Sequence, residues 1–281
     1  MKIRQILIGL TVFTTLVLSA CKSEFEKIRA IGDPAAMYKR ADEYYAKEEY
    51  QKAQALYELV ISSFRGRPEA EEITFRHAYT YYYTGQYILA AYYFKNFVQT
   101  YNLSPKREEA DFLAAYSNYQ MSPSFRLDQS YSEKAIDGLQ LFISTYPQSE
   151  RVKECNRLID EMRRKQEVKA MEEGRLYFEM RQYQAAIRTY ENLLRDFPET
   201  ENIENIRYQI TRAAFLLASN SFVEKQETRY REALAYADEF VARFPNSRYR
   251  KEAESMVNDS KKKLKQLSNV GHQNQSSRSR S

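Results

Sequence analysis

The sequence predicts an all-α protein, a solenoid of about five helix hairpins closed by a C-terminal capping helix. Aromatic residues and alanines recur at three- and four-residue steps, the spacing of one face of an α-helix. The pattern then returns at an interval of 37 residues, for example from Ala41 to Ala78. Only seven glycines and no alternating β-branched stretches leave little room for a sheet.

The clearest repeat occupies residues 72–101, EITFRHAYTYYYTGQYILAAYYFKNFVQTY, with a short break at residues 84–86. Ala78 before the break and Ala90 after it are small enough to let two helices approach closely. Such a hairpin cannot bury its apolar face alone, so neighbouring copies must stack against it.

The copies share their aromatic and alanine positions. A step of 37 residues backward gives Ala41, Tyr44, Tyr50, Ala53, Tyr57 and Phe64, and a step forward gives Phe112, Ala115, Tyr116 and Tyr119. Later copies end in an aromatic–proline pair: Tyr146-Pro147, Phe197-Pro198 and Phe244-Pro245. This order resembles the tetratricopeptide repeat over roughly residues 33 to 267. Each aromatic–proline pair is expected to end one helix, with the Ser or Thr that follows capping the next.

The N-terminus has the features of an export signal. A basic start at Lys2 and Arg4 precedes an apolar run over residues 6–18, which is shorter than the about 20 residues of a membrane span. Residues 1–20 are therefore predicted to be a signal peptide.

Leu18-Ser19-Ala20-Cys21 resembles a bacterial lipoprotein processing box. The resemblance implies that Cys21 takes a diacylglycerol and becomes the acylated (palmitate-type) mature N-terminus. The alternative is an ordinary signal peptide followed by an incidental cysteine. Lys22, in place of the Asp that retains many such proteins at the inner membrane, implies the outer membrane. With Cys21 acylated, Cys155 has no partner for an intramolecular disulfide.

The domain organisation follows from these segments. Residues 21–32 are predicted to be a charged tether, residues 33–267 the repeat domain, and residues 268–281 a disordered basic Ser/Arg tail. Within the repeat domain we expect a Ser/Pro-rich insert at residues 122–126 and a second long loop at residues 220–229. A separate charged helix is expected over residues 149–169, before a fourth repeat that begins at Met171.

Charge and residue types favour a binding protein over an enzyme. The formal charge of +5 falls to 5 − 2 = +3 without Lys2 and Arg4, and to +1 without Arg278 and Arg280. So small a charge disfavours a nucleic-acid partner. The two histidines are His77, predicted to be structural, and His272 in the tail, and no phosphate-loop, GxSxG, HExxH or CxxC motif occurs. We expect no catalytic activity, no cofactor and no metal.

Aromatic rows on the first helices are the candidate ligand surface. In repeats of this kind, some first-helix positions face the concave groove, where rings offer contact area at low entropic cost. The predicted groove residues are Tyr38, Tyr45, Phe75, Tyr79, Tyr82, Phe112, Tyr116 and Tyr119. The alternative is that these rings pack the core between repeats. On the second helix of repeat four, Arg188, Glu191 and Arg195 are candidates for docking a folded partner, or are simply solvated charges.

The processing box, the five repeats, the long third-repeat loop and the passage AIRTYENLLRDFPET (residues 186–200) together resemble the BamD family. The resemblance implies a lipoprotein on the periplasmic face of the outer membrane, in the machinery that inserts β-barrel proteins. It also implies that the N-terminal repeats receive unfolded outer-membrane proteins. The C-terminal repeats would dock a BamA-like barrel subunit, and other lipoproteins of the machinery would be further partners.

Two other functions stay open at this stage. One is a periplasmic repeat lipoprotein of envelope maintenance or cell division. The other is an envelope enzyme such as a peptidoglycan hydrolase, for which the sequence offers no catalytic constellation. The tyrosine-rich groove and the basic tail have no counterpart in the BamD pattern.

Overall fold

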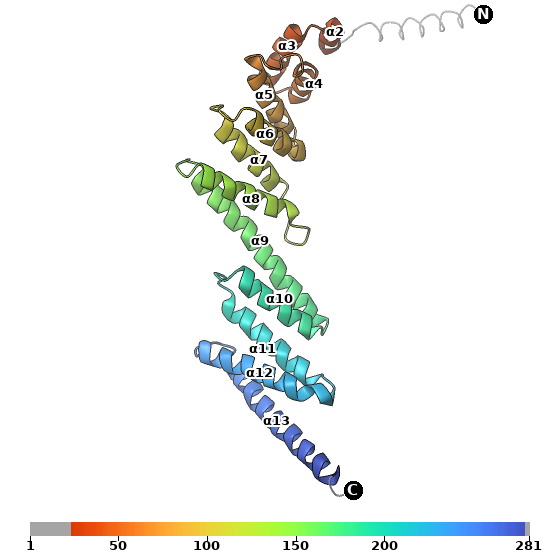
Figure 1. The fold of residues 1–281 in the computed structure, drawn as a ribbon, viewed down its shortest axis with the longest axis vertical. Helices are drawn as coiled ribbons and strands as arrows, with labels where there is room; N and C mark the ends of the chain where they lie inside the picture. Colours follow the sequence, from red (N-terminus) through yellow and green to blue (C-terminus); the bar gives the residue numbers. More distant parts are fainter. Residues whose placement is uncertain (1–23, 279–281) are drawn as a thin grey trace, which may run out of the picture. The chain divides into compact units, whose positions relative to one another are not determined.

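The computed structural model describes the backbone of residues 24–278 and the side chains of residues 24–269, and all regular elements in that range are α-helices (Figure 1). The helices are α2 (Glu24–Ile31), α3 (Pro34–Ala46), α4 (Tyr50–Val60), α5 (Glu69–Tyr83), α6 (Tyr87–Thr100), α7 (Arg107–Gln120), α8 (Ser130–Thr145), α9 (Val152–Glu179), α10 (Tyr183–Asp196), α11 (Ile203–Ser219), α12 (Val223–Arg243) and α13 (Arg250–Arg278). The predicted all-α class of tetratricopeptide-like hairpins is confirmed. The predicted signal peptide and Cys21 lie outside the described residues.

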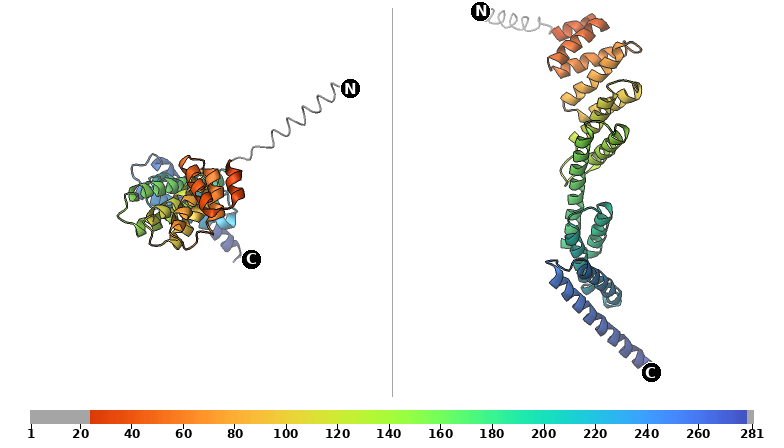
Figure 2. Two further views of the ribbon diagram at one scale, coloured as in Figure 1. Left: turned by 90° about the horizontal axis from the view of Figure 1, so that it is seen from above. Right: turned by 90° about the vertical axis from the view of Figure 1, so that its left-hand side faces the viewer.

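The described chain divides into two compact units. The first holds α2 to α8 and the start of α9, up to Met162. The second holds the rest of α9, α10 to α13 and the short segment 124–126. Inside each unit, helices that follow one another in sequence pack side by side, as two further views show (Figure 2).

The turn inside a hairpin has the same backbone in three repeats. The second-last residue before the second helix has a positive φ: 60° at Glu48, 73° at Gly85 and 60° at Arg181. In the second of these turns, the amide of Gln86 donates to the carbonyl of Tyr81 at 2.9 Å, which satisfies a carbonyl at the helix end. Glycine adopts this left-handed conformation without steric cost, whereas the other two repeats accept a side chain there.

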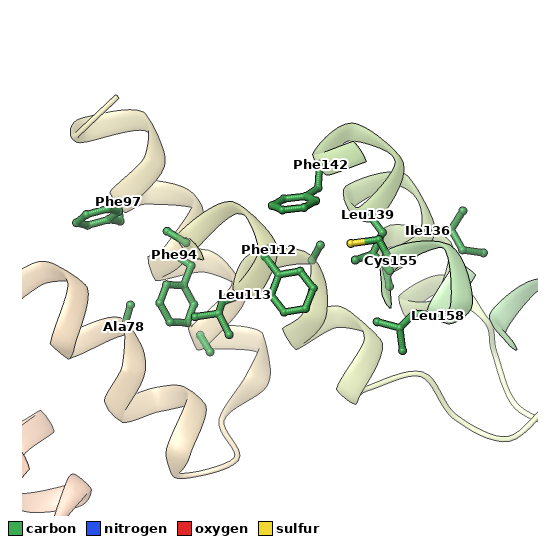
Figure 3. Close-up of a cluster of buried hydrophobic side chains, with 14 of the residues drawn as sticks. Ala78, Phe94, Phe97, Phe112, Leu113, Ile136, Leu139, Phe142, Cys155 and Leu158 are labelled. Carbon is green, nitrogen blue, oxygen red and sulfur yellow. The ribbon is translucent and has the colours of Figure 1, made fainter. Parts of the chain in front are cut away.

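Small residues and aromatic rings fill the core between hairpins. In the first unit Ala78 and Ala90 are fully buried in one core cluster with Phe94, and Figure 3 shows Ala78 and Phe94 of this cluster. The cluster continues through Phe112, Leu139, Phe142, Cys155 and Leu158. At the α7–α8 contact a Cβ on Gly138 would lie 2.9 Å from that of Ala115, so only glycine permits this approach.

The predicted helix-ending corners are confirmed in detail. Tyr146 donates its amide to the carbonyl of Phe142, and the Ser149 hydroxyl accepts the amide of Arg151 at 3.2 Å. The same hydroxyl donates to Glu108 at 2.6 Å, on the preceding first helix. Equivalent hydroxyl–carboxylate pairs are Ser104–Glu71, Thr200–Glu167 and Ser247–Glu204. Each corner therefore caps one first helix and ties it to the first helix before it.

The structure differs from the sequence expectation inside the repeat domain at two points. α9 is one helix of 28 residues, with no break before Met171, because no proline interrupts it. The expected loop at residues 220–229 is mostly helix, since α12 begins at Val223.

The structure also differs from the sequence expectation at the predicted tether and the predicted tail. Part of the predicted tether is α2, whose Phe25 and Ile28 pack on the core of the first hairpin. α13 continues to Arg278, into the predicted tail, because no proline ends it.

Candidate functional site

A continuous series of tyrosine rings runs over α3 to α7 in the first unit. Tyr45 contacts Tyr50 with ring centroids 5.5 Å apart, and Tyr50 stacks on Tyr83 at 4.5 Å. Tyr83 stacks in turn on Tyr79 at 5.3 Å and lies 5.7 Å from Tyr82. Such pairs contribute about 0.5–1.5 kcal/mol each beyond the area they bury.

The series continues from α5 to α7. Tyr82 contacts Tyr87 at 5.7 Å and Tyr116 at 6.4 Å, and Tyr116 stacks on Tyr119 at 5.4 Å. We call these eight residues the tyrosine ladder: Tyr45, Tyr50, Tyr79, Tyr82, Tyr83, Tyr87, Tyr116 and Tyr119. Tyr83 is 48% exposed and the other seven are half-buried, so ring area stays open to solvent along the ladder.

Hydrogen bonds from two ladder tyrosines link the first helices of the unit to one another. Tyr79 donates its hydroxyl to Glu109, and Tyr119 donates to Glu161 at 2.9 Å. These bonds join α5 to α7 and α7 to α9. Burial, followed by the bond to Glu109, raises the pKa of Tyr79 above its ordinary value. Two of the hydroxyls are thus engaged inside the protein, and the surface offered at those positions is aromatic carbon.

Between α3 and α5 the link is an ion pair. Arg76 lies 3.0 Å from Asp42, and Asp42 also accepts the Tyr57 hydroxyl at 2.6 Å. Asp42 occupies the position that Tyr79 and Tyr116 hold in the next two repeats. In the first repeat the ladder therefore consists of Tyr45 and Tyr50, without a ring at position 42.

Five of the eight predicted groove residues lie in the ladder, and three do not. Phe75 and Phe112 are 7% and 3% exposed and belong to the core, so the expectation that they line a groove is wrong. Phe75 packs on Phe97 at 5.0 Å, which shows that this position points into the hairpin. Half-buried Tyr38, at the same position in the first repeat, packs edge-on against Phe64 at 5.3 Å.

Sequence analysis missed Tyr50, Tyr83 and Tyr87 as surface residues. Tyr50 and Tyr87 stand 37 residues apart at the start of second helices, a spacing that marks the repeat without showing that the rings reach the surface. The sequence pattern that could reveal them is a repeated pair of aromatic residues five positions apart: Tyr45 with Tyr50 and Tyr82 with Tyr87. Phe178 with Tyr183, at 5.5 Å, is the same pair in the second unit.

Arginines take the place of the ladder tyrosines in the second unit. Tyr79 stands three residues before Tyr82, and Arg175 stands three residues before the equivalent Phe178. Arg175 is held between Glu172 at 2.6 Å and Glu179 at 2.5 Å. Arg212, one 37-residue step further, lies over the Phe178 ring at 4.9 Å. This row is charged and its cations are already engaged.

An open hollow of about 480 Å³ lies among α10, α11 and α12. Two of the three predicted docking residues, Arg188 and Glu191, line it together with Ile187. Glu191 accepts the hydroxyl of Tyr236, another lining residue, at 2.5 Å. Arg195 is exposed, pairs with Asp196 at 3.3 Å and is not part of the lining.

His77 and Cys155, the histidine and the cysteine whose side chains lie in the described range, are buried. His77 is 2% exposed between Tyr81 and Tyr93, with ring centroids 5.0 and 4.9 Å away, and burial lowers its pKa to about 4. Burial raises the pKa of the Cys155 thiol to about 11. In the described range no three His, Cys, Asp or Glu residues cluster to hold a metal ion. None of the helices described is long and apolar enough to cross a membrane.

The solved structures that are similar to this chain include tetratricopeptide-repeat proteins. A repeat protein from Bacteroides fragilis is 15% identical, with 82% of this chain and 98% of that chain covered and a TM-score of 0.35. The TPR2AB domain of yeast Sti1, in complex with a pHSP90, is 13% identical, with 81% and 98% covered and a TM-score of 0.37. The MamA protein is 18% identical, with 76% and 96% covered and a TM-score of 0.30. No curated protein sequence matches the chain.

A family pattern identifies the chain more directly. The pattern described as "YfiO: Outer membrane lipoprotein" matches residues 31–220, from the end of α2 to the end of α11. This span includes the whole tyrosine ladder and more than half of the chain. The expectation of a BamD-type protein, drawn from the processing box and the repeats, agrees with this match. The chain belongs to the YfiO family of outer membrane lipoproteins.

Proposed function

We propose that this protein is a scaffold of the β-barrel assembly machinery, anchored through lipid on Cys21 to the periplasmic face of the outer membrane. Its first unit would receive unfolded outer-membrane proteins, and its second unit would dock the central barrel subunit. The observation that carries the proposal is the tyrosine ladder, a partly exposed aromatic surface in a member of the YfiO lipoprotein family.

The ladder suits an extended, apolar ligand. An unfolded β-barrel segment presents aromatic and aliphatic side chains on alternate residues, because such strands face lipid on one side. Ring faces bind such side chains with large contact area and little loss of side-chain entropy. The bonds of Tyr79 to Glu109 and of Tyr119 to Glu161 fix the rings before a ligand arrives, which lowers the ordering cost of binding.

The second unit suits a folded partner. Its hollow combines apolar Ile187 and Leu217 with the charges of Arg188 and Glu191. A folded domain with complementary charges can fill such a surface, since charge pairs fix its orientation and apolar contacts add affinity.

Photo-cross-linking tests the substrate half of the proposal. A photoreactive phenylalanine analogue in place of Tyr82 is expected to capture unfolded barrel precursors in living cells. The matched control is Tyr92, an exposed tyrosine of α6 in the same unit that lies outside the ladder. Failure at Tyr82, or equal capture at both positions, would count against substrate binding on the ladder.

Co-purification from gently solubilised membranes tests the docking half. Arg188→Glu is expected to reduce recovery of the barrel subunit, because it reverses a charge in the hollow. Arg250→Glu, which changes an exposed arginine on α13 paired with Glu254, serves as the control. Unchanged recovery with Arg188→Glu would place the docking surface elsewhere.

A further inference from the structure

The segment that joins Cys21 to the first described helix is very short. Only Lys22 and Ser23 stand between Cys21 and Glu24, the first residue of α2. Three fully extended residues span roughly 11 Å. If Cys21 carries lipid, as the proposed function requires, the start of α2 must lie within that distance of the lipid headgroups.

α2 is itself part of the folded unit and is not a spacer. Phe25 packs on Tyr44 with ring centroids 6.2 Å apart, and Ile28 joins the same core. Arg40 of α3 lies 2.5 Å from Glu24, which fixes the first turn of the helix. The short link therefore brings the first hairpin to the bilayer together with α2.

The outer side of α2 and the end of α4 form an exposed surface with the composition of a membrane interface. Ile31 is 69% exposed and Leu59 is 48% exposed. Arg29, Ala30 and Leu59 line one open hollow, together with Glu26. Apolar side chains beside cations are the combination that enters the boundary between headgroups and acyl chains.

The charges on this surface do not oppose such a contact. Glu24 faces Arg40 and Glu26 faces Arg29 at 3.3 Å, so each acidic side chain of α2 has a cation beside it. Lys27 is exposed on the same helix. Basic side chains close to a bilayer are attracted by anionic lipids.

We propose that this surface, formed by Glu26, Arg29, Ala30 and Leu59 around the open hollow with the exposed Lys27 and Ile31 on the adjoining side of α2, rests on the bilayer and holds the first unit against the membrane. The inference goes beyond the proposed function because it assigns a second membrane contact besides the lipid. The inference depends on the lipid at Cys21. The experiment distinguishes failure of the lipid anchor from failure of this second contact.

The test uses the full-length lipidated chain in vesicles of phosphatidylethanolamine and phosphatidylglycerol. A bimane fluorophore is attached in separate variants at Leu59→Cys, Ile31→Cys and Leu141→Cys. Leu141, 67% exposed on α8 of the same unit, is the matched control. Cys155 is buried and stays unlabelled. A lipid that carries a quenching doxyl group near its headgroup is then included.

The expected result is a loss of fluorescence at positions 59 and 31 with little change at position 141, in protein that floats with the vesicles. Flotation without quenching at positions 59 and 31, or with equal quenching at 141, would overturn the membrane contact and leave the anchor intact. Protein that does not float, with an unmodified Cys21 by mass spectrometry, would overturn the anchor and the contact together.

Discussion

The two units of this protein use the same repeat but differ at one surface position. Three residues before the end-of-helix aromatic, the first unit has Asp42, Tyr79 and Tyr116, whereas the second has Arg175 and Arg212. The ring pair behind that position is the same in both units, at 5.7 Å for Tyr82–Tyr87 and 5.5 Å for Phe178–Tyr183.

This difference separates the residues that build a hairpin from those that give it a ligand. The ring pair packs in the same way in both units, so its contact belongs to the fold, and in the first unit its open ring area also forms part of the ladder. The surface position has no packing duty common to all repeats, since carboxylate, tyrosine and arginine all occur there. Binding specificity in a repeat protein is therefore sought at positions that vary between repeats.

The largest expected effect is loss of a core ring in the first unit. Phe94 is fully buried and meets Phe75 at 6.1 Å and Tyr79 at 5.1 Å. Phe94→Ala should cost about 3–5 kcal/mol of the free energy of unfolding. Urea denaturation followed by circular dichroism measures the loss. Hydrogen exchange should place it in the first unit. A cost as small as that of Tyr92→Ala, on the exposed side of the same helix, would contradict this core assignment.

Acid should weaken the first unit through His77. Its pKa is about 4 in the folded protein, against an ordinary value near 6.5, because burial between Tyr81 and Tyr93 disfavours the charged ring. Between these values the unfolded chain binds a proton that the folded chain does not. The stabilisation is complete above about pH 6.5 and is lost as the pH falls to 4, by at most about 3 kcal/mol.

Urea midpoints between pH 7 and pH 4 measure this dependence. His77→Phe keeps a ring of similar size without a titrating group, so its midpoint should change less with pH. An equal pH dependence in both proteins would assign the acid sensitivity to other groups.

Gly174→Ala should destabilise the second unit although alanine is the better helix former. Gly174 holds the place of Ala41 and Ala78, but a Cβ there would overlap the Tyr190 ring. Overpacking of this kind costs about 1–3 kcal/mol, which exceeds the gain of up to about 1 kcal/mol in helix propensity. Thermal unfolding measures the net change in stability from these two opposing effects. Adding Tyr190→Leu should recover part of the loss, and a stabilised single variant would show that the ring can move aside.

Much of this fold could be predicted from spacing, and the exceptions have physical causes. The 37-residue interval indicated the hairpins, and the aromatic–proline corners indicated their ends. Phe75 and Tyr79 both lie on the periodic face, and the sequence does not show that the first points inward and the second reaches the surface. That choice depends on Phe97, which packs on Phe75 from the neighbouring helix.

The ends of the repeat domain were harder to predict for a similar reason. α2 is charged and short, and its helical state depends on the packing of Phe25 and Ile28 against a core that begins elsewhere in the sequence. The continuity of the ladder could not be predicted from the sequence either, because Tyr50 and Tyr83 stack although they are far apart in the chain.

The smallest expected effect concerns peptide binding by Tyr83 of the ladder. Tyr83 is the most exposed ladder ring and stacks on Tyr50 and Tyr79, so Tyr83→Ala removes ligand contact area with little loss of core. For a fluorescent peptide with alternating apolar residues and a C-terminal Phe, we expect a loss of about 1 kcal/mol, a roughly fivefold higher Kd by fluorescence anisotropy. Tyr92→Ala should leave the Kd unchanged. Equal losses in the two variants would mean that the peptide does not distinguish the ladder from other exposed rings of the first unit.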